Sequence, residues 1–255
     1  MKTAIITGAS SGVGTEFLKV LVQDNSIEEF WIIARNEKRL EELKAQYSNK
    51  SIVCIPLDLT NEESMQVYEN HLRAKKPEVV TLVNNAGFGI LGEVYGSDYV
   101  EQAKMVDLNC RALTTITTMT LPYMIDNSGI INMASIAAYC PNPNFTVYCS
   151  AKAYVLSYSR SLRYELRMKK RKINSLAVCP GPMNTNFCAT AGITTQFDDL
   201  PFTDPAKVAK TAVKKLREGK AVYTPGAFFK FYRCIAKLLP HSLVMGFSQT
   251  IKDGK

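Results

Sequence analysis

The sequence predicts an α/β protein in which one doubly wound parallel sheet carries helices on both faces. Short apolar runs alternate along the chain with amphipathic segments of helical period. This alternation is typical of parallel strands joined by crossover helices, because such strands are buried on both sides. The chain has 255 residues and lacks an internal repeat or a linker rich in proline and glycine, so we expect a single domain.

Strands and helices are expected to follow one another regularly from the N-terminus. The strands are expected at residues 2–7, 29–34, 51–57, 79–83, 129–134 and 173–178, with a late one near 220–224. The helices are expected at residues 12–23, 37–47, 61–73, 98–124, 148–169 and 204–218. We divide this domain into a catalytic part at residues 1–225 and a basic amphipathic C-terminal extension at residues 226–255.

The composition is that of an ordinary globular protein, with 46% hydrophobic and 21% charged residues. Seven cysteines without a CxxC pair argue against a secreted disulfide framework and favour reduced thiols in the cytoplasm. The two histidines, His71 and His241, have no partner at metal-ligand spacing, so no metal site is expected. The first apolar run is too short for a signal peptide, and we expect a cytoplasmic protein.

The net charge of +8 is concentrated near the C-terminus. Residues 205–255 carry eleven Lys and Arg against only Glu218 and Asp253, whereas the rest of the chain is nearly neutral. Such asymmetry indicates either an anionic partner or a solvated basic face. Basic residues and Pro240 interrupt the apolar residues of the segment 226–247, so it cannot span a membrane. It can lie on a membrane surface, close over a pocket or pack between subunits; no nucleic acid partner is expected.

Glycines and polar residues follow the ends of six predicted strands. In an open parallel sheet, ligands bind outside the carboxyl ends of the strands, near the point where the strand order reverses. We therefore expect a binding site at this edge. The positions are Gly8, Arg35, Asp58, Asn84, Ser135 and the pair Pro180-Gly181.

The segment TGASSGVG at residues 7–14 joins the first strand to the first helix. Glycines there permit a tight turn and let the backbone approach a pyrophosphate, which the free amides and the dipole of the helix N-terminus attract. The spacing is GxxxGxG rather than GxGxxG, and a glycine-rich turn without a ligand is the alternative. We predict a dinucleotide site that includes Gly8, Ser10, Ser11, Gly12, Val13 and Gly14.

Arg35 stands about 20 residues beyond the glycine turn, where NAD-binding proteins usually carry a carboxylate. An arginine would instead pair with the 2′-phosphate of NADP(H), which is the favoured cofactor, with NAD(H) as the alternative. Arg35 can also be a surface residue that opens the next helix. Asp58 can accept from an adenine amino group or cap a turn. The predicted cofactor site continues with Asp58, Leu59, Asn84, Ala86 and Gly87.

Tyr148 and Lys152 lie four residues apart in YCSAK, so they share one face if the segment is helical. A tyrosine has an ordinary pKa of about 10 and needs nearby positive charge to exchange protons near neutral pH. Ser135 supplies a hydroxyl that can hold a substrate oxygen. An exposed pair without function is the alternative. We predict hydride transfer between a nicotinamide cofactor and a carbonyl or alcohol.

Seven motifs in this order resemble the short-chain dehydrogenase/reductase family, in its typical small subgroup. The resemblance covers about residues 2–225 and implies a Rossmann-like fold. The motifs are TGASSGVG, DLT at 58–60, NNAG at 84–87, LNCRA around Asn109, MAS ending at Ser135, YCSAK, and PGPMNT at 180–185.

The resemblance implies a role for each matching residue. Tyr148 would donate the proton in reduction, and Lys152 would hold the nicotinamide ribose and lower the tyrosine pKa. Ser135 would bond the substrate oxygen, while Asn109 would hold a water that links Lys152 to solvent. The carboxamide end of the cofactor would be anchored by Pro180, Gly181, Met183 and Thr185.

The pocket walls are expected at residues 88–96, 136–147 and 183–203, which are apolar and carry few charges. We therefore predict an NADP(H)-preferring oxidoreductase of the EC 1.1.1 type that acts on a hydrophobic ketone or aldehyde, with steroid-, acyl- or xenobiotic-like character. The alternatives are an NAD(H)-dependent alcohol or hydroxysteroid dehydrogenase, and a non-enzymatic nucleotide-sensing or membrane-surface protein. The resemblance also implies a homodimer or homotetramer, paired through the helices at 98–124 and 148–169.

Overall fold

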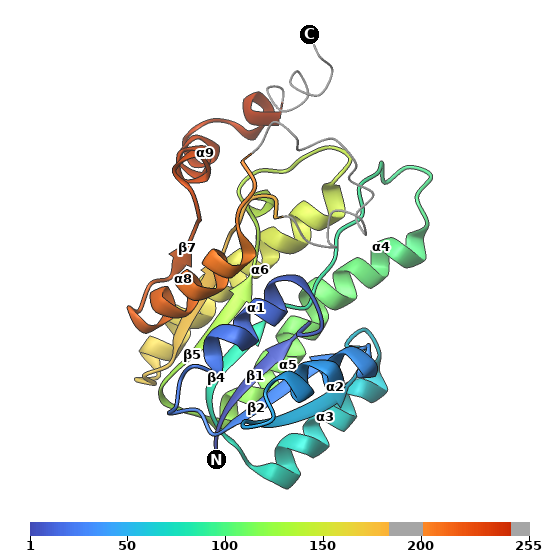
Figure 1. Cartoon of the computed structure of the whole chain (residues 1–255). Coiled ribbons are helices and arrows are strands. Elements are labelled where there is room, and N and C mark those ends of the chain that lie inside the picture. The colour runs from blue at the N-terminus through green and yellow to red at the C-terminus, as the bar shows by residue number, and fades with distance from the viewer. Residues whose placement is uncertain (184–200, 246–255) are drawn as a thin grey trace.

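The protein folds around one parallel sheet of seven strands in the order β3-β2-β1-β4-β5-β6-β7, which confirms the predicted α/β class (Figure 1). The computed structural model describes residues 1–183 and 201–245. The chain enters at β1, runs outward to β3, and then crosses to β4 on the other side of β1. The strand order therefore reverses between β1 and β4, which is where a ligand site is expected.

The elements agree with the predicted ones to within a few residues, with one exception described below. The strands are β1 (Lys2–Thr7), β2 (Glu29–Ala34), β3 (Ser51–Pro56), β4 (Glu78–Asn84), β5 (Met124–Met133), β6 (Asn174–Val178) and β7 (Val222–Tyr223). The α-helices are α1 (Gly12–Leu21), α2 (Glu37–Gln46), α3 (Glu62–Lys75), α4 (Tyr99–Val106), α5 (Leu113–Thr120), α6 (Thr146–Met168), α8 (Pro205–Arg217) and α9 (Ala227–Leu238). The short elements are the π-helix η1 (Asp107–Ala112) and the 3-10 helices η2 (Leu121–Tyr123) and η3 (Ile136–Ala138).

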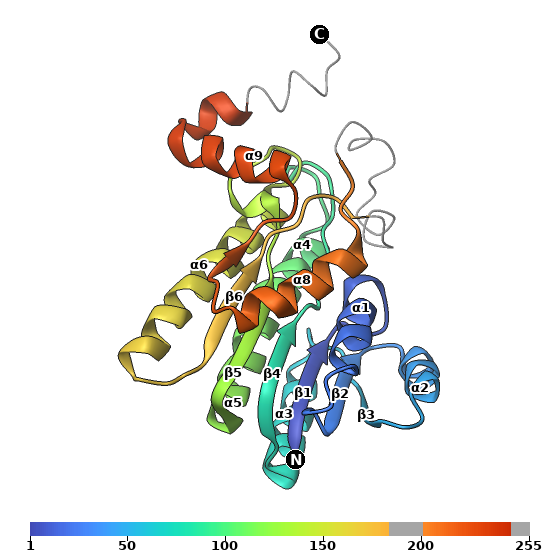
Figure 2. The same ribbon diagram turned by 60° about the vertical axis from the view of Figure 1, so that its left-hand side comes forward.

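Two hydrophobic cores, one on each face, hold the helices to the sheet (Figure 2). Helices α1, α2 and α8 cover one face, and α3, α5 and α6 cover the other. Neighbouring strand residues point to opposite faces, so Ile5 packs under α3 and α5 whereas Ile6 packs under α1. Because both faces are covered, the strands are almost continuously apolar, as in β2, whose six residues are all buried.

The prediction of one continuous helix at residues 98–124 is wrong, because this segment contains four elements in succession. Helix α4 passes through the π-helix η1 into α5, and the short η2, which contains Pro122, ends the helical run. Strand β5 then begins at Met124, five residues before the predicted strand. Met124 pairs with Val79, and regular pairing resumes at Gly129 after an irregularity. The polar residues inside that irregularity hide the start of the strand from a periodicity argument.

Helix α9 lies beyond the carboxyl ends of β5 and β6 (Figure 2). Its Phe229 is buried against Gly181, which follows β6, and a Cβ atom at Gly181 would come within 2.2 Å of the Phe229 ring. Farther along α9, Ala236 packs with Cys140, which follows β5. The basic amphipathic C-terminal segment therefore contains a helix, which packs against the loops at the carboxyl edge of the sheet. Among the described residues, no helix is both long and apolar enough to cross a membrane.

Candidate active site

The glycine turn after β1 is held by the side chain of Asn85, which follows β4. Asn85 Nδ2 donates to the carbonyl oxygens of Thr7 and Gly8, both at 3.1 Å. Gly8 has a φ of +65°, and a Cβ atom at Gly14 would lie 2.1 Å from the Gly8 carbonyl oxygen. A side chain is therefore excluded at both positions, by conformation at Gly8 and by contact at Gly14. Thr7 Oγ1 accepts from the amides of Asn85 and Ala86, at 3.0 and 3.1 Å, and joins the turn to the next strand end.

The N-terminus of α1 is free to bind an anion. Ser11 precedes the helix without a side-chain capping hydrogen bond, and the first turn carries no acidic residue. The first amides of a helix have no intrahelical acceptor, and the helix dipole favours negative charge there. The predicted residues Ser10, Ser11 and Gly12 lie at this end, while the side chain of Val13 is buried against the sheet.

Arg35 and Asp58 lie at the ends of the neighbouring strands β2 and β3. Arg35 is exposed and forms no salt bridge with a described carboxylate, although Asp58 lies near enough to interact with its charge. Asp58 accepts from the amide and the hydroxyl of Thr60, at 2.9 and 2.7 Å. Burial alone would raise the pKa of Asp58, but these hydrogen bonds, with Arg35 and Lys104 nearby, lower it below its ordinary value. Asp58 thus remains charged near neutral pH and holds the turn in which Leu59 is buried.

Asn84 lies beneath the site rather than on its surface. Its Nδ2 donates to Thr117 Oγ1 and to Asn132 Oδ1, both at 2.8 Å, and the side chain is 3% exposed. Asn132 in turn donates to Ser159 on α6 at 2.9 Å. This buried chain of hydrogen bonds ties β4, β5 and α6 together at the level where the strands end.

The ammonium group of Lys152 is buried at the end of β5. Its Nζ donates to the Met133 carbonyl oxygen at 2.9 Å and lies 5.6 Å from the centroid of the Tyr148 ring. Lys152 is 5% exposed, and burial lowers its pKa from 10.5 to about 8, against the opposing effects of Cys110 and Cys179. Tyr148 is buried as well, with its ring stacked on Phe145 at 4.4 Å. A positive charge therefore stands next to the predicted acid and base.

Asn109 faces the same point as Lys152 from the π-helix η1. Its Nδ2 donates to the carbonyl oxygens of Phe88, at 2.7 Å, and Met105, at 2.9 Å. Its Oδ1 is buried and has no hydrogen-bond partner among the described residues. A Cβ atom at Gly87 would lie 2.5 Å from that oxygen and 3.2 Å from Lys152 Nζ. Gly87 thus lies next to both polar groups.

Ser135 caps the N-terminus of the 3-10 helix η3, where its Oγ accepts from the Ala137 amide at 3.2 Å. The amide of Ile136 donates to the Pro180 carbonyl oxygen at 3.0 Å, which joins the loop after β5 to the loop after β6. Met183 is the last described residue of this loop, and Thr185 lies outside the described residues. The structure therefore brings together the ends of β5 and β6, with Tyr148 and Lys152 beside them on α6.

An apolar cluster surrounds the stacked pair Tyr148 and Phe145. Its buried members include Met105 and Cys149, and Phe88, Ile90 and Leu91 pack against it from the loop after β4. Two of the predicted pocket walls, at residues 88–96 and 136–147, thus meet at Tyr148. Most of the third wall lies outside the described residues.

Several residues of this site escape sequence reasoning. Asn85 belongs to the motif NNAG, yet only the fold shows that it, rather than Asn84, contacts the glycine turn. Phe145 belongs to the pocket wall predicted at residues 136–147, but only the fold shows that its ring stacks on Tyr148. From the C-terminal segment, Phe229 contacts Gly181, and the Arg233 guanidinium lies 5.7 Å from the centroid of the Tyr139 ring. The basic amphipathic pattern of residues 226–247 is the only sequence signal for these last contacts.

The described residues fit a bound nicotinamide dinucleotide. The tight turn that Gly8 and Gly14 permit leads into the uncapped N-terminus of α1, whose amides can donate to phosphate oxygens. The unpartnered Asn109 Oδ1 and the buried Lys152 lie at the far end of the same edge. The described part of the chain holds no group of three metal-ligating side chains.

Comparison with known proteins supports this assignment. The family model described as short chain dehydrogenase matches residues 2–195. A protein of Haemophilus influenzae named as a probable NADP-dependent dehydrogenase is 32% identical over 191 residues, which cover 72% of this chain and 74% of that protein.

Two solved structures have a similar fold. A short-chain dehydrogenase from Sphingobium yanoikuyae in complex with NADPH has a TM-score of 0.79 at 23% identity, with 94% of this chain and 97% of that chain covered. A short-chain dehydrogenase/reductase from Burkholderia phymatum in complex with NAD has a TM-score of 0.80 at 20% identity, with 91% and 92% covered. The sheet topology, the tyrosine and lysine at its catalytic edge and the family match together show that this chain belongs to the short-chain dehydrogenase/reductase family of oxidoreductases.

Proposed function

We propose that the protein is an NADP(H)-preferring reductase that interconverts a hydrophobic ketone or aldehyde and its alcohol. Tyr148 acts as the acid and base, Lys152 holds the positive charge, Ser135 holds the substrate oxygen and Asn109 completes the site. The observation that carries this proposal is the burial of Lys152 beside Tyr148 at the end of β5. A buried ammonium without a carboxylate partner is costly, and stabilising a developing phenolate accounts for its presence.

Each residue has a task that follows from its position. When bound, the nicotinamide dinucleotide supplies the hydride in reduction and accepts it in oxidation. Tyr148 gives its phenolic proton to the oxygen of the carbonyl, and the charge on Lys152 stabilises the phenolate that remains. The free Oδ1 of Asn109 can accept from a water beside Gly87, through which a proton can return to Tyr148 by way of Lys152. Ser135 donates from its hydroxyl to the same substrate oxygen.

The preference for NADP(H) depends on Arg35. Its guanidinium is exposed at the end of β2 and forms no salt bridge with a described carboxylate, so its N–H donors remain available to a 2′-phosphate. Ile33, two residues earlier, accepts from the Ala9 amide at 3.3 Å, which puts Arg35 beside the glycine turn. The Haemophilus relative named as a probable NADP-dependent dehydrogenase and the NADPH complex of the Sphingobium enzyme support the same preference. The NAD complex of the Burkholderia enzyme keeps NAD(H) as the alternative.

The substrate class follows from the apolar wall around Tyr148. Phe88, Ile90 and Leu91 supply aromatic and aliphatic surface next to the reacting group. A phosphorylated sugar would leave its charge unpaired against this wall, whereas an apolar ketone would bury carbon surface there. This apolar wall therefore favours an apolar carbonyl compound.

A thermal-shift titration with NADPH and NADH, followed by a screen of apolar ketones with NADPH, tests the proposal. NADPH should stabilise the protein at a lower concentration than NADH, and at least one apolar ketone should be reduced. Tyr148→Phe should lower the turnover by about 10²- to 10⁴-fold while keeping the stabilisation by NADPH. Tyr99→Phe, at a residue that is 82% exposed, is the matched control and should keep full turnover. Unchanged turnover in Tyr148→Phe would refute the mechanism.

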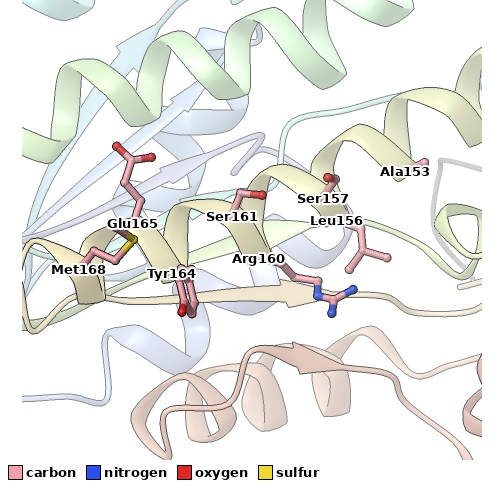
Figure 3. A pocket seen from close by; sticks show the side chains of 8 residues that line it. All are labelled: Ala153, Leu156, Ser157, Arg160, Ser161, Tyr164, Glu165 and Met168. Carbon is pink, nitrogen blue, oxygen red and sulfur yellow. The ribbon is translucent and has the colours of Figure 1, made fainter.

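We also propose that the protein is a homodimer paired through the outer face of α6. This face bears a groove of about 640 Å³ whose lining residues all belong to α6 (Figure 3). Small residues recur every four positions along it, next to a row of longer side chains, and the ridge of a second helix can pack along this row. Tyr164 and Met168 are 68% and 73% exposed at its end. The groove is lined by Ala153, Leu156, Ser157, Arg160, Ser161, Tyr164, Glu165 and Met168.

Light scattering after gel filtration tests the dimer. The wild-type protein should have twice the mass of the chain, and Ser157→Arg, which fills the groove, should have the mass of a single chain. Ser26→Arg, in the exposed turn before β2, adds the same side chain elsewhere and should remain dimeric. A wild-type protein with the mass of one chain would exclude this interface.

A further inference from the structure

The outward face of α9 carries an unusual set of side chains. The large apolar residues Phe231 and Leu238 are 65% and 80% exposed, seven positions apart and hence on one side of the helix. Lys230 and Lys237 stand beside them, also seven positions apart and exposed. Of the sixteen large hydrophobic residues that are exposed in the described chain, five lie between residues 228 and 243. They are Phe228, Phe231, Leu238, Leu239 and Leu243.

The charge of this segment has one sign. No aspartate or glutamate occurs between Glu218 and Asp253. Lys230, Arg233 and Lys237 form no ion pair with any described residue. A face that combines exposed apolar side chains with unpaired basic ones is complementary to a surface that is negative outside and apolar beneath.

The face of α9 that carries Phe229 and Ala236 packs against the rest of the protein. The opposite, outer face, with Phe231 and Leu238, is therefore held in one orientation. Phe229, which is 2% exposed, contacts Gly181 after β6, and Ala236 packs with Cys140 after β5. Arg233 lies over the ring of Tyr139. These contacts connect the helix to the two loops that border Tyr148 and Lys152. Whatever binds the outer face of α9 is therefore held next to the catalytic edge of the sheet.

We propose that the outer face of α9 docks on a membrane surface that contains anionic lipids. The apolar residues enter the boundary between headgroups and acyl chains, while Lys230 and Lys237 meet the phosphates. A second copy of the chain fits this face poorly, because a two-fold contact through α9 would bring lysines against lysines without a carboxylate in either helix. Docking would orient the catalytic edge toward the lipid. If the proposed function holds, this orientation suits an apolar substrate that is dissolved in the membrane.

Flotation with lipid vesicles tests the docking without any substrate or cofactor. The full-length protein should float with vesicles of phosphatidylcholine mixed with an equal share of phosphatidylglycerol, less so in high salt, and hardly with phosphatidylcholine alone. Lys230→Gln combined with Lys237→Gln should weaken binding about thirtyfold, since each basic side chain near an anionic surface contributes about fivefold. Phe231→Ser combined with Leu238→Ser should also weaken it while leaving the charge unchanged.

Matched controls separate this site from general adsorption. Lys38→Gln with Lys75→Gln removes the same charge from exposed positions on α2 and α3, and Val67→Ser with Tyr99→Ser removes exposed apolar surface from α3 and α4. Both controls should bind vesicles like the wild type. All variants should keep the wild-type melting temperature, because the substituted side chains are exposed.

Three outcomes would overturn the proposal. The first is an absence of flotation with the anionic vesicles. The second is an equal loss of binding in the controls, which would indicate adsorption by net charge alone. The third is a lower mass in light scattering for the Phe231→Ser, Leu238→Ser variant than for the wild type, which would identify a second copy as the occupant. None of these outcomes depends on turnover, so the docking and the proposed reaction can fail separately.

Discussion

The glycine turn and the reacting end lie at the same edge of the sheet but are built in opposite ways. Around Gly8 and Gly14, side chains are absent, and the site consists of backbone held in place by Asn85. Around Lys152 and Asn109, polar side chains are buried, one of them with an oxygen that no described residue satisfies. The first region should therefore be sensitive to added atoms, and the second to lost charge. Substitutions that affect one region and spare the other can test this contrast.

The largest effect is expected at the reacting end. Lys152→Met keeps most of the side-chain volume but removes the charge that faces Tyr148. We expect turnover with an accepted ketone to fall on the order of 10³-fold, the usual range for losing acid–base catalysis. Stopped-flow measurement of NADPH oxidation gives the rate. Lys104→Met, which removes an exposed lysine from α4, is the control. If Lys152→Met turned over at the wild-type rate, the buried ammonium would have no catalytic role.

The same lysine should lower the stability of the protein in a manner that depends on pH. Because the pKa of Lys152 falls from 10.5 in the unfolded chain to about 8 in the fold, the charged form opposes folding by at most about 3 kcal/mol. This penalty is complete below about pH 8 and disappears as the pH rises to 10.5, because the unfolded chain binds more protons in that window.

The free energy of unfolding of Lys152→Met should therefore exceed that of the wild type near neutral pH, and the difference should shrink between pH 8 and pH 10.5. Urea denaturation of both proteins at each pH measures it. Titrations of groups that do not interact with Lys152 cancel in the difference, whereas those of Cys110 and Cys179 do not. A difference that stays constant with pH would contradict the buried charge.

A smaller effect is expected at the glycine turn. In Gly14→Ala, the added Cβ would lie 2.1 Å from the Gly8 carbonyl oxygen, so the turn must shift at a cost of about 1–3 kcal/mol. Binding of NADPH, measured by calorimetry, should weaken together with stability. Gly219→Ala, whose φ of +68° costs roughly 1–2 kcal/mol far from the turn, should lose stability but bind NADPH normally. Equal binding in both variants would mean that the turn does not hold the dinucleotide.

The smallest effect is expected at Arg35, where only the choice between two cofactors is at stake. Arg35→Ser removes a charge-assisted hydrogen bond to a 2′-phosphate and should reduce the preference for NADPH over NADH by roughly tenfold. The ratio of kcat/KM for the two cofactors measures it. Lys38→Ser, three residues later and also exposed, should leave the ratio unchanged. An unchanged ratio in Arg35→Ser would favour the NAD(H)-dependent alternative.

Local sequence patterns predicted most of the strands and helices, because buried strands and amphipathic crossover helices each have a characteristic spacing of apolar residues. Spacing alone placed the glycine turn after the first strand and YCSAK on a helix after the fifth, and the structure brings Tyr148 and Lys152 together on α6. The π-helix at Asn109 could not be predicted, because π-helices are rare and occur mostly as single turns within α-helices. The early start of β5 was hidden by the polar residues of an irregular stretch.

The sequence by itself determined the α/β class, the order of strands and helices, and the chemical types of residue at the catalytic edge. These depend on periodicity and on neighbours a few positions apart. Only the tertiary structure decided that Asn85 holds the glycine turn, that Gly87 lies next to both Asn109 and Lys152, and that Phe229 closes on Gly181. Such contacts join residues that are distant along the chain, and they depend on how the strand ends and α9 pack in space. The same packing exposes Phe231 and Leu238 on the outer face of α9. The pattern of residues 226–247 alone was compatible with contact to a membrane surface, to a pocket or to another subunit.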